Sequence, residues 1–65
     1  MKRNKLAAII VENGLTQKKV AEKLNMSPKT FYNKMKKGVF GTNEVQSMVD
    51  FLHIVDPIDI FLLNE

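Results

Sequence analysis

Residues 28–36 carry polar side chains at a spacing that could bind nucleic acid. Lys29, Tyr32, Asn33 and Lys36 are spaced by three or four residues, which places them on one face of a helix. Lysine ammonium groups bind phosphate oxygens, and lysine or asparagine can also hydrogen-bond to base edges. This face contains no acidic residue. Its chemistry favours double-stranded DNA, whose major groove admits one α-helix.

The elements that would position this face form a helix-turn-helix over about residues 17–36. A second helix can cross the first closely at Ala21 because that side chain is small. Asn25 follows four residues later and tolerates the positive φ of a sharp turn. Apolar side chains flank both positions and lock the crossing, and they are Val20, Leu24, Met26 and Phe31. With the crossing locked, the polar face of the second helix points outward, with Ser27 and Pro28 at its tip.

The whole chain is expected to form five short helices, because no stretch alternates apolar and polar residues long enough for a strand. They are predicted at residues 3–13, 17–24, 28–37 and 43–53, with a short fifth helix beginning at Pro57. Helix boundaries are indicated by N-cap residues and by residues that tolerate positive φ, namely Thr16, Ser27 and Thr42 as N-caps and Gly14 and Gly38 as terminators. His53 is expected to be a partly buried helix-end residue. The sequence predicts one all-α domain over residues 1–65.

Charge is divided unevenly along the 65 residues. All ten Lys and Arg residues lie in residues 1–38 with only Glu12 and Glu22 opposing them, so this half carries a net +8. Residues 39–65 contain five acidic residues and no Lys or Arg, for a net −5. The first half therefore favours a polyanionic partner and the second does not.

Composition excludes several classes of protein. The chain has no Cys and one His, so disulfides, cysteine nucleophiles and thiolate zinc sites are ruled out. It also has no Gly-rich phosphate loop and no apolar run near the roughly 18 residues of a membrane span. We expect a soluble cytoplasmic protein that is not an enzyme and that needs no metal, cofactor or small-molecule substrate.

Two strings of residues resemble the lambda-repressor-like family of phage and bacterial regulators, the Cro and XRE type. The string T-Q-K-K-V-A-E-K-L-N-M-S-P-K-T-F is similar to that family's helix-turn-helix pattern, and D-P-I-D-I-F-L is similar to its last helix. The number, order and loop lengths of the expected helices agree as well. The resemblance implies a compact five-helix DNA-binding domain.

The resemblance also assigns roles to individual residues. Lys29 and Asn33 match positions that read bases, while Ser27 and Thr30 match positions that contact phosphate or bases. The remaining candidates are Tyr32, which either reads bases or packs at the surface, and the phosphate contacts Gln17, Lys18, Lys36, Lys37, Thr42 and Asn43. Lys18 could equally be a merely solvated lysine. Pro28 stands where many relatives carry a base-reading side chain, so that contact is missing. Lys34 stands where an inward apolar residue is usual, and Met35 takes over one residue later.

The C-terminal helix has more apolar residues than one inward face can hold. Ile58, Phe61 and Leu62 cannot all point inward together with Ile60 and Leu63. We expect a weak homodimer through Ile58, Phe61 and Leu62, because one recognition helix reads only about four or five base pairs.

Two functions remain open from the sequence. The first is a sequence-specific transcriptional regulator, a Cro-like phage or prophage repressor that binds a palindromic operator as a dimer. No effector or sensor domain is expected to follow it. The alternative is a protein-interaction module, such as an antirepressor or antitoxin, that acts through its acidic and apolar C-terminal half. The basic outer face of residues 28–36 favours the first.

Overall fold

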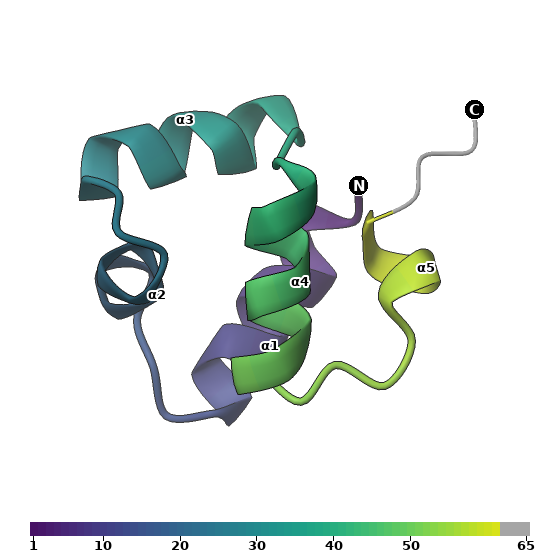
Figure 1. Cartoon of the computed structure of the whole chain (residues 1–65). Helices are drawn as coiled ribbons and strands as arrows, with labels where there is room; N and C mark the ends of the chain where they lie inside the picture. The colour runs from purple at the N-terminus through teal and green to yellow at the C-terminus, as the bar shows by residue number, and fades with distance from the viewer. Residues whose placement is uncertain (62–65) are drawn as a thin grey trace.

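The computed structural model describes residues 1–61, and within them it is all-helical, as predicted. Figure 1 shows the helices α1 (Arg3–Glu12), α2 (Gln17–Lys23), α3 (Pro28–Lys37), α4 (Thr42–Phe51) and α5 (Pro57–Phe61). Each boundary lies within two residues of its predicted place. Leu62 and Leu63, predicted to continue the last helix, lie outside the described residues.

Two of the predicted N-caps are confirmed and the third is wrong. The Thr16 hydroxyl accepts the backbone N–H of Lys19 at 3.1 Å, and the Ser27 hydroxyl accepts that of Thr30 at 3.2 Å. Thr42 is not a cap but the first residue of α4, which Gly41 precedes as N-cap. Glu44 makes this possible because its carboxylate reaches back from the first turn and accepts the Gly41 N–H at 2.8 Å.

Each helix from α1 to α4 ends in the same way, on a residue in the left-handed conformation. At all four ends the next N–H reaches back five residues to a helix carbonyl, as from Val39 to Lys34 at 3.1 Å. The left-handed residues are Gly14, Asn25, Gly38 and His53, with φ of 71°, 58°, 73° and 55°. The first three were predicted. The expectation for His53 was wrong in its burial: His53 follows the last residues of α4, as expected, but it is exposed.

The core lies where α1, α2, α3 and α4 meet. Phe31 of α3 is completely buried there, with the buried residues Leu6, Ile10, Val20, Ala21, Met35, Met48, Leu52, Ile54 and Ile60 around it. Ala21 is 0% exposed at the crossing of α2 and α3, as its small side chain predicted. Phe40 follows α3 and packs its ring 5.5 Å from that of Phe31. These contacts hold α3 against the body of the protein by one face only.

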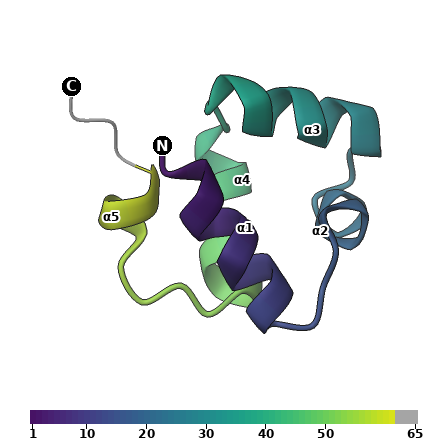
Figure 2. The same ribbon diagram turned by 180° about the vertical axis from the view of Figure 1, so that it is seen from behind.

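The residues at the two ends of α1 bind the C-terminal part of the described chain. The backbone N–H of Lys2 donates to the carbonyl of Ile60 at 2.8 Å, and Figure 2 shows α5 beside the start of α1. At the other end of α1, the amide of Asn13 donates to the carbonyl of Leu52 at 3.1 Å. The two ends of α1 are therefore joined to α5 and to the end of α4.

Candidate nucleic-acid interface

Helix α3 lies across one end of the molecule with its outer face uncovered (Figure 1). The amphipathic spacing of its residues explains this placement, because Phe31 and Met35 point into the core. Lys29, Tyr32, Asn33 and Lys36 are all exposed, and Tyr32 retains 47% of its surface. The structure therefore brings together the polar face that the spacing predicted.

The tip of α3 carries two hydroxyl groups that bind each other. Besides accepting the Thr30 N–H, the Ser27 hydroxyl donates to the Thr30 hydroxyl at 2.9 Å. Both residues remain exposed at the start of α3. With this geometry the Ser27 hydroxyl caps its own helix, and the Thr30 hydroxyl lies beside it at the exposed tip. The role that the structure gives Ser27 is thus that of N-cap of α3.

The predicted phosphate contacts lie on three elements. Gln17 and Lys18 begin α2, and Lys36 and Lys37 end α3. Thr42 and Asn43 are exposed in the first turn of α4, which four residues separate from the end of α3. Their N–H groups, as the first two of a helix, have no acceptor within it. Gln17 is half-buried and the other residues of this set are exposed.

Lys34 differs from the other lysines of α3. Its Nζ lies 2.9 and 3.0 Å from the two carboxylate oxygens of Glu44. The Gly41 N–H and this ammonium group both stabilise the charged carboxylate and lower the pKa of Glu44. The Gly41 N–H thus already donates to the carboxylate of Glu44. A phosphate near the start of α4 would have to bind the N–H groups of Thr42 and Asn43 instead.

The lysines fall into two groups: those whose ammonium group already contacts a carboxylate or an aromatic ring of the protein, and those without such a contact. Within residues 1–61, ion pairs join Lys2 and Lys5 to Asp59, Lys19 to Glu22, and Lys34 to Glu44. Lys23 lies over the ring of Phe51, 5.5 Å from its centroid. In the same described range the lysines with neither an ion pair nor an aromatic ring beneath them are Lys18, Lys29, Lys36 and Lys37. All four are among the predicted DNA contacts.

Comparison with known proteins agrees with this arrangement. Residues 3–38, more than half of the chain, match the family of bacterial regulatory proteins of the Fis type. The chain belongs to the Fis family of bacterial regulatory proteins. The matched segment begins with α1 and ends at Gly38, so it holds α1, α2 and α3. It is a helix-turn-helix DNA-binding domain. No curated protein and no solved structure matches the chain.

The Fis-family segment does not include α4 and α5, which lie beyond Gly38. The match supports the helix-turn-helix that both families share and does not extend to the Cro and XRE type. Residues 1–61 contain no group of three His, Cys, Asp or Glu side chains placed to hold a metal ion. None of their helices is long and apolar enough to cross a membrane.

One residue that positions α3 was missed by the sequence interpretation. The guanidinium of Arg3 donates to the carbonyl of Lys36 at 3.0 Å, in the last turn of α3. A cation at this end of a helix also interacts favourably with its dipole. The two residues are 33 positions apart, and no local pattern reports such a contact.

Proposed function

We propose that this Fis-family chain is a sequence-specific repressor of transcription, similar to a small Cro-like phage or prophage regulator, that binds a palindromic operator as a homodimer. The observation that carries the proposal is the outer face of α3. Lys29, Tyr32, Asn33 and Lys36 are exposed there while Phe31 and Met35 anchor the helix from behind. A helix fixed by one face and polar on the other can enter the major groove without unfolding.

In this proposal, α3 lies in the major groove with its N-terminal part deepest. Asn33 and Lys29 hydrogen-bond to base edges, with Tyr32 beside them and the hydroxyl of Thr30 at the tip. Phosphates on either side are bound by the cations and amides that flank α3, namely Gln17, Lys18, Lys36, Lys37, Thr42 and Asn43. Ser27 keeps α3 capped and lies close enough to the tip to touch the same strand.

The dimer is supported by the apolar surface of α5. Ile58 is 68% exposed, and it lines a shallow apolar depression together with Val45, Pro57 and Phe61. Leu62, the third predicted contact, lies outside the described residues. Two copies paired through this surface would present two recognition helices, about 34 Å apart on a palindromic site.

The experiment that tests the proposal is selection of random duplex DNA by the full chain, followed by sequencing of the bound fraction. The proposal predicts enrichment of a palindromic consensus, whose half-sites repeat after about 10 base pairs. Enrichment of a single half-site would contradict the homodimer but would leave sequence-specific binding supported. No enrichment over the starting pool would contradict sequence-specific binding and favour the protein-interaction module.

A further inference from the structure

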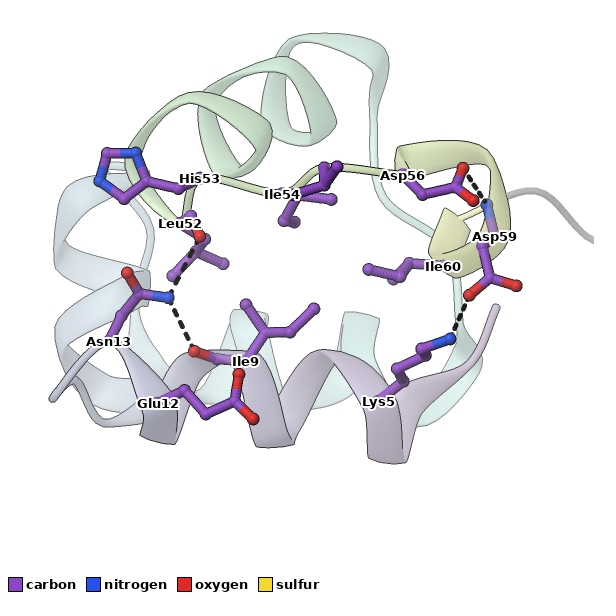
Figure 3. Close-up of a pocket in the computed structure, with 11 residues that line it drawn as sticks. Lys5, Ile9, Glu12, Asn13, Leu52, His53, Ile54, Asp56, Asp59 and Ile60 are labelled. Carbon is purple, nitrogen blue, oxygen red and sulfur yellow. Dashed lines mark hydrogen bonds and ion pairs between the residues drawn. The ribbon is translucent and has the colours of Figure 1, made fainter.

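A groove outside the candidate DNA interface runs between α1 and the segment that joins α4 to α5. Its volume is about 490 Å³. Figure 3 shows α1 along one side and the stretch from His53 to Asp56 along the other, with Ile9, Ile54 and Ile60 pointing into the space between them. Small-molecule sites typically enclose roughly 300–1,000 Å³, so the groove is of suitable size.

Both ends of the groove are closed by contacts between its two walls. At one end the Asn13 amide donates to the carbonyls of Leu52 and Ile9, at 3.1 and 2.9 Å. At the other end the ammonium of Lys5 pairs with Asp59 (Figure 3). An extended peptide needs a channel that is open at its ends. The closed groove instead suits a compact small molecule.

The floor of the groove is apolar and its rim is negatively charged. Ile54 and Ile60 are buried, whereas Glu12 and Asp56 are exposed on the rim. Among residues 1–61, neither of these two carboxylates forms an ion pair, and Asp56 only accepts the N–H of Asp59 at 3.3 Å. Lys5 shares the carboxylate of Asp59 with Lys2, and it is one cation among lining residues that include the three carboxylates of Glu12, Asp56 and Asp59. The lining therefore retains an excess of negative charge above an apolar floor.

We propose that this groove binds a small organic cation. Its ammonium group meets the carboxylate of Glu12, and its apolar body packs against Ile9, Ile54 and Ile60. The opposite ligand, an apolar anion, would meet repulsion from Glu12 and Asp56.

The groove and the outer face of α3 are available at the same time. Figures 1 and 2 show the segment between α4 and α5 at the end of the molecule away from α3. Binding in the groove consequently does not depend on the function proposed for α3, and the two proposals fail separately.

The test is a titration of the full ¹⁵N-labelled chain with hexylammonium, followed through backbone amide shifts. We expect shifts at the groove residues, including Ile9, Asn13, Ile54 and Asp59, and smaller effects along α3. Hexanoate serves as the probe of equal length and opposite charge, and hexan-1-ol as the neutral one. Hexylammonium should bind more tightly than either.

Two variants locate the charge that selects the ligand. Glu12→Gln should weaken hexylammonium binding by about two- to fivefold, the scale of an exposed ion pair. Glu22→Gln, an equally exposed change on α2, should leave it unaltered. The proposal is overturned if hexylammonium shifts no groove amide or if hexanoate binds as tightly as hexylammonium. It is also overturned if Glu12→Gln and Glu22→Gln bind hexylammonium with the same affinity.

Discussion

The two halves of this chain differ in charge and in what they leave exposed. Residues 1–38 hold every Lys and Arg and include the Fis-family segment 3–38, whereas residues 39–61 hold four acidic residues and no Lys or Arg. The first half exposes the polar face of α3. The second exposes Val55 and Ile58, which retain 95% and 68% of their surface.

This difference shows how the acidic half shapes the basic one. Asp59 binds Lys2 and Lys5, and Glu44 binds Lys34. Three cations of the first half are thus paired with two carboxylates of the second, and the lysines without such a partner are concentrated on α2 and α3. The acidic half therefore holds the DNA-binding half in place and also selects which lysines remain available.

The largest effect should come from the crossing of α2 and α3. Ala21→Glu buries an unpaired charge at a site that is 0% exposed, and we expect it to cost about 3 kcal/mol or more. Ala8→Glu is the matched control, because Ala8 is exposed on α1. Urea unfolding measures both. If the two variants were equally stable, α3 would not be positioned by this crossing.

A second variant tests whether the acidic half pairs two copies. Ile58→Asp should leave the isolated chain folded but weaken binding to a palindromic operator by about tenfold, with loss of cooperativity. Val55→Asp adds the same charge at another exposed apolar residue and should have no such effect. Titration of operator DNA, with circular dichroism as the folding control, separates the two. Unchanged cooperative loading by Ile58→Asp would place the dimer interface elsewhere.

The lysines of α3 allow a sharper comparison within one helix. Lys36→Ala should weaken binding to every DNA sequence alike and reduce the slope of log affinity against log salt by about 0.9. Lys34→Ala should leave that slope unchanged, since Glu44 already neutralises Lys34. Affinities measured over a series of salt concentrations test this. Equal slopes for the two variants would mean that Lys34 leaves Glu44 to bind phosphate.

The smallest effect concerns the ion pairs between the halves at low pH. The ammonium groups of Lys2 and Lys5 hydrogen-bond to Asp59 and lower its pKa from 3.8 to about 2. A lowered pKa in the folded state means that the stabilisation is complete above about pH 4 and is lost as the pH falls towards 2. Asp59→Asn should therefore lower the melting temperature slightly at pH 6 and leave it unchanged at pH 2. If Asp59→Asn lowered the melting temperature by the same amount at both pH values, the charge of Asp59 would not be the cause.

Much of this fold was predictable because its signals are local. Caps such as Thr16 and Ser27, left-handed residues such as Asn25, and the spacing of Phe31 and Met35 each act within one turn of helix. His53 was missed as a terminator although histidine, like asparagine, is enriched among non-glycine residues at positive φ. The apolar Ile54 after it follows the same pattern as Leu15 after Gly14.

The candidate site was predictable only in part. The exposed face of α3 followed from helical periodicity. The contacts that link it to the rest of the protein did not, because the partners are distant in sequence. Arg3 with Lys36 and Lys34 with Glu44 form only once the helices have packed, and the second pair decides that Lys34 is a structural lysine.

The central claim is that the outer face of α3 reads base edges, and comparing specific with non-specific binding tests it most directly. Asn33→Ala and Lys29→Ala should each lose about 1–3 kcal/mol of discrimination between the selected operator and random duplex at one salt concentration. Affinity for random duplex should change little for Asn33→Ala. Lys37→Ala, as the control, should lose affinity equally on both DNAs. Equal losses on operator and random DNA for Asn33→Ala would contradict base reading by this face.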